Sequence, residues 1–463
     1  MSEKKRSSFT GSIGFVLAAA GSAVGLGNIW RFPYLAAKDN GGLFILCYII
    51  LALTFGFALL TTEIAIGRKT KQSPLTAYGK INKKMGGIGY LATIVPVIIL
   101  PYYCTIGGWV LKYLFTFVSG KGIDAAADGY FTSYITSQWQ PLIWMFIFLG
   151  VTALTVFCGV DKGIEKLSKV LMPILLVLVM GISIYSLTLS YTDASGITRT
   201  GLDGLKIYLI PDFTGVTFKD FFVILMDAMG QLFFSISVSM GIMVAYGSYV
   251  KDDTNLMKSI NQIEIFDTII ALLAGLMIVP AVFVFMGREG MSAGPGLMFV
   301  SLPKVFAQMG KIGGFIGLLF FIMVAFAAVT SSVSIMEAIV SSVMDKYHFS
   351  RKKSTVLVLA YALVFGVIVC LGYNVFYFEL KLPNGSVGQI LDVFDYASNN
   401  ILMPLVALLT SILIGWIVKP KTIIDEVTKN GEKFGRKTIY IIMMKFVVPI
   451  LIFALLLQAV GIF

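Results

Sequence analysis

Residues 21–34 read Gly-Ser-Ala-Val-Gly-Leu-Gly-Asn-Ile-Trp-Arg-Phe-Pro-Tyr. This stretch lies inside a long apolar segment that should cross a membrane, yet it contains several glycines together with Asn28, Arg31 and Pro33. Glycine loosens a helix and proline ends one. Hydrocarbon tolerates the unpaired backbone groups of a broken helix only where they face protein or a polar cavity. Because freed carbonyls suit a cation and freed N–H groups suit an anion, the stretch predicts a binding site within the membrane.

The composition is typical of a membrane protein. Of the 463 residues, 57% are hydrophobic and 13% are charged, whereas soluble domains carry about 25% charged residues. We therefore predict an all-α polytopic membrane protein with a single membrane domain. Eleven apolar segments approach the roughly 20 residues that a span requires, at about 11–37, 43–67, 88–117, 141–158, 165–190, 220–247, 257–286, 312–344, 354–372, 390–418 and 438–462.

The charge of the chain indicates its membrane topology. Lysine and arginine outnumber aspartate and glutamate by 36 to 25, which gives a net charge of +11. If the N-terminus with Lys4, Lys5 and Arg6 lies in the cytoplasm, most basic loop residues also lie inside, as the positive-inside rule requires. We expect no nucleic-acid partner and no cleavable signal peptide. An odd number of spans then leaves the C-terminus outside.

Other segments also place polar groups inside the predicted spans. Residues 230–241 hold three serines between flanking glycines, and serine hydroxyls compete for backbone hydrogen bonds. Interrupted first and sixth spans indicate a site between two halves of a transporter, although serines also line ordinary helix contacts. Thr330 and Ser331 offer adjacent oxygens that suit a hard cation, with simple packing as the alternative. The apolar, Gly- and Pro-rich loop 287–310 should fold against the protein as a lid.

Ionisable residues within membrane spans are functional candidates by default. Here they are Arg31, Glu63, Asp227, Asp267, Glu337 and Asp395. The predicted spans hold no His cluster, Cys pair or Ser–His constellation, which argues against an enzyme. The scarcity of charged rings argues against a channel. A sensor that binds without transporting, and a carrier coupled to protons through Asp267 or Glu63, stay open as alternatives.

Several motifs together resemble the neurotransmitter:sodium symporter family. They are Asn28 with Arg31-Phe-Pro33, Asn40-Gly-Gly42, Glu63 with Gly67-Arg68, Tyr102-Tyr103, Gln231 with Phe233-Phe234-Ser235, and Thr330-Ser-Ser332. The resemblance implies a leucine-transporter-like fold, with two inverted five-helix repeats at 11–190 and 220–418, helices 1 and 6 broken at mid-membrane, and an additional helix at 438–462. The eleven-span form resembles the bacterial branch, which implies an amino-acid transporter of the inner (plasma) membrane, as a monomer or homodimer in the lipid bilayer.

Carried over residue by residue, the resemblance implies two Na+ sites and one substrate site. The first sodium site would use the Ala23 carbonyl, Asn28, Ser235 and Asp267, with the substrate carboxylate as a further ligand. The second would use the carbonyls of Gly21, Val24 and Ala327 and the hydroxyls of Thr330 and Ser331. The substrate site would be formed by Ser22, Ala23, Gly25, Leu26, Gly27, Ile99, Tyr103, Phe234, Ser235, Ser237, Met240, Ser331 and Ile335. Arg31 with Asp395 would form the outer gate, and Arg6 with Asp345 the inner gate.

The pocket residues also imply the kind of substrate. Monoamine carriers of the family have an acidic residue at the position of Gly25, so the ligand here should bring its own carboxylate, which Tyr103 would bind. Ile99, Met240 and Ile335 add no charge to the walls. We therefore expect a neutral aromatic or large aliphatic amino acid.

Two departures from the family pattern concern chloride. The family usually has asparagine where this chain has Asp267, and Ala271 stands where chloride-dependent members have serine. Tyr48, Gln231 and Ser235 remain from the family's chloride site. A fixed carboxylate at Asp267 would replace the anion, so we expect transport without chloride.

The fifth span has a second family feature. Gly163 and Pro173 match the family's Gly-x₉-Pro spacing. Proline removes a backbone donor, and glycine lowers the cost of local opening. The resemblance implies that the inner pathway opens by unwinding here, with a plain proline kink as the alternative.

Overall fold

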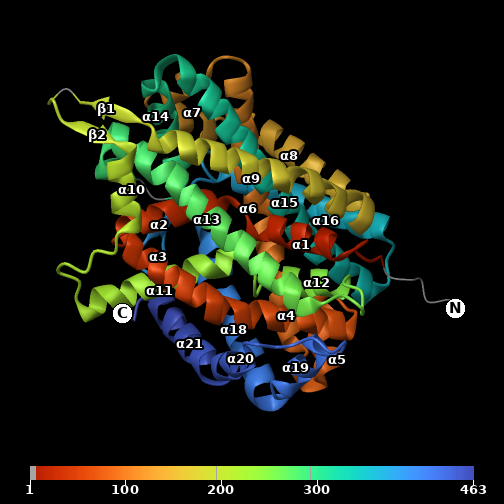
Figure 1. Ribbon diagram of the computed structural model, residues 1–463. Helices are drawn as coiled ribbons and strands as arrows, with labels where there is room; N and C mark the ends of the chain where they lie inside the picture. The colour runs from red at the N-terminus through yellow and green to blue at the C-terminus, as the bar shows by residue number, and fades with distance from the viewer. Residues whose placement is uncertain (1–6, 194, 292–293, 463) are drawn as a thin grey trace.

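The computed structural model describes residues 7–193, 195–291 and 294–462. Within these ranges, nine helices are long and apolar enough to cross a membrane, and Ser12–Ala23 with Gly27–Lys38 form a further candidate span bent by 54°. The helices pack into one bundle with small hairpins on its periphery (Figure 1). The prediction of an all-α polytopic membrane protein is confirmed.

The spans run in chain order between short connecting elements. After the broken first span come α3 (Gly42–Leu51) with α4 (Phe57–Thr70), α6 (Gly87–Val118), α8 (Gln140–Phe157), α9 (Lys166–Leu187), α11 (Phe218–Ser235) with α12 (Ile242–Ser248), α13 (Leu256–Met286), α15 (Gly313–Tyr347), α16 (Arg351–Leu371), α17 (Ile390–Asp395) with α18 (Met403–Ile412), and α20 (Lys437–Ile442) with α21 (Val448–Ala459). The connections carry α5 (Pro74–Ile81), α7 (Tyr130–Ile135), α10 (Gly201–Leu209), α14 (Leu302–Gln308), α19 (Lys421–Val427) and two antiparallel hairpins, β1 (Ser190–Thr192) with β2 (Thr198–Thr200) and β3 (Leu380–Lys381) with β4 (Val387–Gly388).

Several spans contain a π-helical turn, in which one extra residue disturbs the regular backbone ladder. In the spans these turns cover Gly27–Arg31, Ala52–Gly56, Val160–Glu165, Tyr396–Leu402, Leu413–Ile417 and Met443–Val447, and a further one, Leu297–Ser301, lies in the loop before α14. Such turns are rare and concentrate at functional sites and kinks. Their positions therefore mark where the helices of this bundle depart from regular, straight α-helices.

The first span breaks where the sequence analysis places the break. α1 (Ser12–Ala23) is followed by Val24, whose ψ of 87° is not helical. The helix resumes as the π-helical turn Gly27–Arg31 and continues as α2 (Phe32–Lys38). Pro33 lies in the first turn of α2, where the N–H that proline lacks would have no helical partner. The break frees backbone groups between the two half-helices.

The sixth span breaks over residues 236–241. Ser237, Ser239 and Gly241 have φ values of 53°, 64° and 72°, in the left-handed region. Non-glycine residues rarely adopt this conformation, and they do so mostly at functional sites. α11 carries Lys219, Asp220 and Asp227, and neither α11 nor the short α12 is among the ten candidate spans counted by length and composition, so the sixth span predicted at 220–247 lies outside that count.

The loop after α13 folds against the protein, as its apolar composition predicts. The Phe299 ring stacks on Phe131 at 5.1 Å, and Trp109 contacts it edge-on at 5.8 Å. The Phe299 carbonyl accepts a hydrogen bond of 2.8 Å from the Tyr113 hydroxyl. These contacts hold the loop over one end of the bundle.

Candidate functional site

The two helix breaks meet inside the bundle. The Ser237 hydroxyl donates a hydrogen bond of 2.9 Å to the Ser22 carbonyl, and the two hydroxyls lie 3.2 Å apart. A Cβ at Gly27 would lie 2.2 Å from the Phe234 ring, so only glycine lets this ring pack onto the first break. The sequence prediction that both interruptions contribute to one region agrees with this geometry.

A buried carboxylate lies at the centre of this region. Asp267 has no exposed surface, and its oxygens accept hydrogen bonds from the Asn28 amide at 2.9 Å, the Ser235 hydroxyl at 2.9 Å and the Tyr48 hydroxyl at 3.3 Å. Over the described residues, Asp267 forms no hydrogen bond or ion pair with a cationic side chain. The buried Oδ1 atom of Asn28 also lacks a partner within the described chain.

This arrangement fits a cation. A buried charge is costly unless another charge compensates it, and the unpartnered Asn28 oxygen adds a ligand of the type that hard cations prefer. Over the described residues, no cluster of three or more His, Cys, Asp or Glu side chains occurs. Asp267 would thus be joined by amide, hydroxyl and carbonyl oxygens, a donor set suited to sodium. The Ala23 carbonyl, Asn28, Ser235 and Asp267 would hold the ion.

The residues expected at the second sodium site also come together. Ser331 Oγ lies 3.3 Å from the Gly21 carbonyl oxygen and 3.5 Å from that of Val24. Thr330 Oγ1 lies 3.2 Å from the Ala327 carbonyl oxygen. Five neutral oxygens from α1 and α15 therefore converge across the first break, and this donor set fits a sodium ion.

A small cavity of about 20 Å³ is lined in part by Ala23 of the first group of oxygens and Ser331 of the second. Ten of the thirteen residues expected at the substrate site line it: Ser22, Ala23, Gly25, Ile99, Tyr103, Phe234, Ser237, Met240, Ser331 and Ile335. Leu26 lines a larger neighbouring cavity, while Gly27 and Ser235 line neither of the two. A Cβ at Gly25 would lie 2.8 Å from Ser331 Oγ and 3.2 Å from the Tyr103 hydroxyl, so a larger residue would fill the space.

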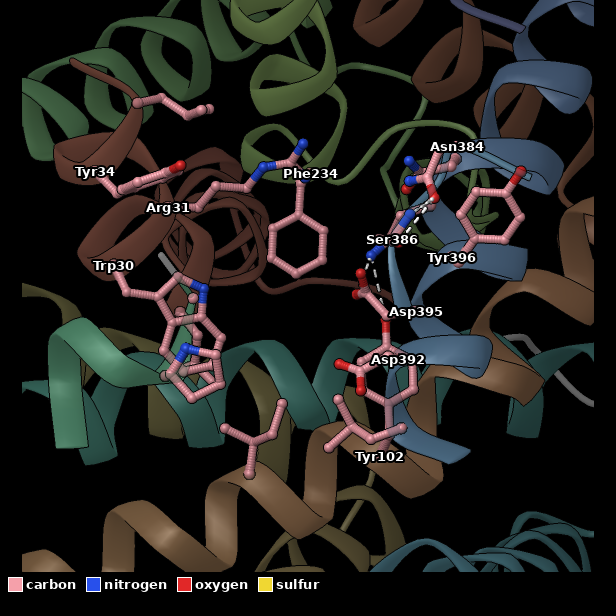
Figure 2. Close-up of a pocket in the computed structure, with 18 of the residues that line it drawn as sticks. Trp30, Arg31, Tyr34, Tyr102, Phe234, Asn384, Ser386, Asp392, Asp395 and Tyr396 are labelled. Carbon is pink, nitrogen blue, oxygen red and sulfur yellow. Dashed lines mark hydrogen bonds between the residues drawn. The ribbon is translucent and has the colours of Figure 1, made fainter. Parts of the chain in front are cut away.

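A vestibule of about 480 Å³ opens above this cavity. Tyr103 and Phe234 line both spaces and so separate them. Arg31 and Asp395 line the vestibule and reach toward it from different elements (Figure 2). The described structure contains no ion pair between them, and Asp395 instead accepts a hydrogen bond of 2.6 Å from Asn399.

The expected contact within the outer gate is therefore not formed in this structure, because the vestibule separates its two members. Closing the vestibule would bring them together. At the vestibule wall, Lys38 forms an ion pair of 2.7 Å with Asp227. This pair compensates the charge of Asp227, one of the ionisable candidates from the sequence.

The opposite end of the bundle is closed. The Phe9 ring is buried against Phe15, Tyr246 and Tyr249. The backbone N–H of Phe9 donates a hydrogen bond of 3.2 Å to the Tyr249 carbonyl. The Thr10 N–H donates to Glu165 at 2.8 Å. Of the expected inner gate, Arg6 lies outside the described residues, and Asp345 accepts a hydrogen bond of 2.6 Å from the Ser73 N–H. Phe9 and Glu165 were not identified from the sequence.

The remaining candidate carboxylates have distinct surroundings. Glu63 accepts a hydrogen bond of 2.6 Å from the Ser239 N–H, so it supports the second helix break. Glu337 forms an ion pair with Arg351 at 2.6 Å and accepts from the Tyr249 hydroxyl at 2.6 Å. Both lie outside the lining of the small cavity.

Comparisons with known proteins identify the family of the chain. A family model described as the sodium:neurotransmitter symporter family matches residues 6–122 and 131–463. An uncharacterized sodium-dependent transporter of Bacillus subtilis, YhdH, is 34% identical over 469 residues, covering 100% of this chain and 99% of the relative. The human sodium- and chloride-dependent GABA transporter 2 is 26% identical, covering 91% of this chain and 75% of that protein.

The crystal structure of MhsT in complex with L-phenylalanine matches with a TM-score of 0.85 and 32% identity, covering 98% of this chain and 100% of that one. Sequence, fold and the convergence of buried oxygens at two broken helices thus lead to one assignment. The chain is not an enzyme but a membrane transporter that belongs to the sodium:neurotransmitter symporter family.

Proposed function

We propose that this protein imports a neutral, hydrophobic amino acid, either aromatic or large aliphatic, together with sodium and without chloride. The observation that carries the proposal is the small cavity bordered by two groups of buried oxygens, one of which contains Asp267. The cavity adjoins a vestibule through Tyr103 and Phe234, and at the opposite end of the bundle Phe9 and Thr10 are held by contacts with other segments. Alternating closure of these two ends would carry the ligand across.

The walls of the cavity support the substrate class. They carry hydroxyl and apolar groups but no charged side chain. The buried Tyr103 hydroxyl forms no hydrogen bond with the described residues and is available to a carboxylate. MhsT, the structural relative at 32% identity, was crystallised with L-phenylalanine.

Two sodium ions would bind, one at each group of oxygens. Thr330→Val combined with Ser331→Ala removes two hydroxyls of the second group and should raise the sodium concentration for half-maximal uptake. Unchanged sodium dependence would remove that assignment.

We further propose that the protein lies in the bacterial inner membrane, with its N-terminus in the cytoplasm and its C-terminus outside. Its spans would form two inverted five-helix repeats, 11–190 and 220–418, followed by an additional helix at 438–462.

The direct test is uptake by proteoliposomes. A panel of labelled amino acids is offered under an inward sodium gradient, and then in potassium without sodium. We expect accumulation of a neutral apolar amino acid in sodium alone, since each tenfold gradient supplies about 1.4 kcal/mol per ion. Uptake that persists without sodium and follows a pH gradient would favour proton coupling, and sodium-dependent binding without flux would favour a sensor.

A further inference from the structure

The loop between α18 and α20, residues 419–436 and here called the strap, carries α19. Its Glu426 is bound by Arg68 at the end of α4: Nε donates to the Glu426 carboxylate at 2.7 Å, and a second nitrogen donates to the Glu426 carbonyl. The third guanidinium nitrogen donates to the Thr254 carbonyl at 2.8 Å. The Arg68 side chain is fully buried, so removal of Glu426 would leave an uncompensated charge inside the protein.

A second arginine holds the other end of the strap, and here the strap supplies the arginine rather than the carboxylate. Arg436 donates two hydrogen bonds, of 2.9 and 2.6 Å, to the Glu264 carboxylate on α13, and another of 2.6 Å to Asn261. It also donates to the Leu53 carbonyl at 3.0 Å and stacks 3.4 Å above the Phe57 ring. Bidentate pairing of this kind fixes geometry as well as charge.

A third contact lies between these two. Asp252, in the connection between α12 and α13, pairs with Lys429 of the strap at 2.7 Å and with Lys71 at 3.0 Å. The Asn430 amide donates to the Asp252 carbonyl at 2.9 Å. The hydrogen bond from Lys429 and the nearby Lys71 hold the pKa of Asp252 below its usual value.

The helices that hold the strap form one unit. A Cβ at Gly67 of α4 would lie 2.1 Å from the Val244 carbonyl of α12, and one at Gly247 would lie 2.3 Å from the Ile64 carbonyl of α4. The two backbones therefore touch directly. α13 follows α12 in the chain, and all the ion pairs between the strap and other described elements lead to α4 or to the segment 252–264.

A π-helical turn lies on each side of the strap: Leu413–Ile417 ends shortly before it, and Met443–Val447 follows it after α20. The two turns face each other. A Cβ at Gly415 would lie 2.6 Å from the Met444 carbonyl, and the Trp416 indole donates to the Lys445 carbonyl at 2.9 Å. The disturbed hydrogen bonding of a π-helical turn makes it a natural place for a helix to bend.

We propose that the strap moves as one rigid body with α4, α12 and α13, and that the tenth and eleventh spans bend at the paired π-helical turns when access changes from one side to the other. Arg68 and Arg436 are then positioning residues for transport. The inference rests on the proposed alternating-access function. Figure 1 shows α19 and α20 beside α4.

Distances between spin labels in proteoliposomes test this directly. The exposed Cys158 is first replaced by serine, since the other cysteines are buried. Labels are placed pairwise at three exposed positions: Asp425→Cys on the strap, Lys258→Cys on α13 and Lys353→Cys on α16. Each pair is measured in sodium with L-phenylalanine and in potassium without amino acid.

We expect the 425–258 distance to stay constant while the 425–353 and 258–353 distances change together. A 425–258 distance that changes between the two conditions would overturn the proposal. A constant 258–353 distance would instead contradict alternating access itself, and the strap proposal would fall with it. The 258–353 distance thus distinguishes failure of the proposed transport function from failure of the strap proposal.

Transport measurements with matched variants complete the test. Glu426→Gln removes the charge opposite Arg68 but keeps an acceptor oxygen, whereas Asp425→Asn makes the same chemical change at the neighbouring exposed position. We expect Glu426→Gln to lower turnover about tenfold, with substrate affinity preserved and a broadened 425–258 distance. Asp425→Asn should resemble the wild type. Glu264→Gln tests the second pair in the same way if Glu426→Gln fails to fold, and full turnover in either folded variant would contradict the proposal.

Discussion

At the scale of single residues, Asp267 would set the charge of the proposed first sodium site. It is fully buried, and within the described chain its oxygens accept hydrogen bonds from an amide and two hydroxyls. A permanent carboxylate here would make an added anion unnecessary. Replacing chloride with gluconate should therefore leave wild-type uptake unchanged.

Asp267→Asn should make uptake depend on chloride. The substitution keeps the shape of the side chain but removes the charge that balances sodium, so we expect uptake in gluconate to fall by at least about tenfold and to recover in part with chloride. Tyr48→Phe is the matched control, because it removes one hydrogen bond to the same carboxylate without changing its charge. Chloride dependence in the wild type would overturn the assignment of Asp267.

A second residue-scale prediction concerns Asp39, between the first and second spans. Burial, with the nearby Asp227, raises the pKa of Asp39 from 3.8 to about 7. The folded state thus binds the proton more tightly, and this stabilising contribution is complete below pH 3.8 and lost as the pH rises through about 7. Asp39→Asn imitates the protonated form, so its Tm should exceed that of the wild type increasingly between about pH 5 and 8.

Thermal unfolding of the detergent-solubilised protein measures this difference. Asp253→Asn alters an exposed aspartate and serves as the control. A Tm difference that stays flat across the pH range would contradict the assignment.

At the scale of elements, the fifth span is where we predict that the inner pathway opens by unwinding. Val160–Glu165 is a π-helical turn, and Pro173 lies inside α9. A Cβ at Gly163 would lie 2.0 Å from the Thr155 carbonyl, so Gly163→Ala would disturb packing whatever the mechanism. Pro173→Ala is the cleaner change, because it restores a backbone donor and strengthens the helix.

Pro173→Ala should slow turnover and leave equilibrium substrate binding close to that of the wild type. Binding and uptake are measured on the same reconstituted preparation. Pro96→Ala, at a proline inside α6, serves as the control for general effects of removing a helix proline. Normal turnover of Pro173→Ala would favour the plain kink.

At the scale of the whole molecule, closure of the vestibule should join Arg31 and Asp395, which the structure holds apart. A double-mutant cycle with Arg31→Ala and Asp395→Ala should give a coupling of about 0.5–3 kcal/mol in transport. The matched cycle of Arg31 with Asp392, which lines the same vestibule, should be nearly additive. Full additivity of the first cycle would show that the two residues are not gate partners.

The sequence was informative where local chemistry decides the structure. Glycine and Pro33 located the first break, and the serines of 230–241 located the second. The family resemblance then named ten residues that the fold brings to one cavity. Contacts between distant segments were not visible in this way: no local pattern shows that Glu165 binds Thr10, or that Arg436 binds Glu264. The π-helical turns were also missed, because their extra residue leaves no clear mark on hydrophobic periodicity.

The fixed charge of Asp267 has an electrical consequence. With two sodium ions and a zwitterionic amino acid, the loaded site would carry one positive charge, and the empty site one negative charge. Both halves of the cycle would then move charge through the membrane field, at about 2.3 kcal/mol per charge per 100 mV if the whole field is crossed. Voltage steps should therefore evoke transient currents even without sodium, and these should vanish in Asp267→Asn, whose empty site is neutral.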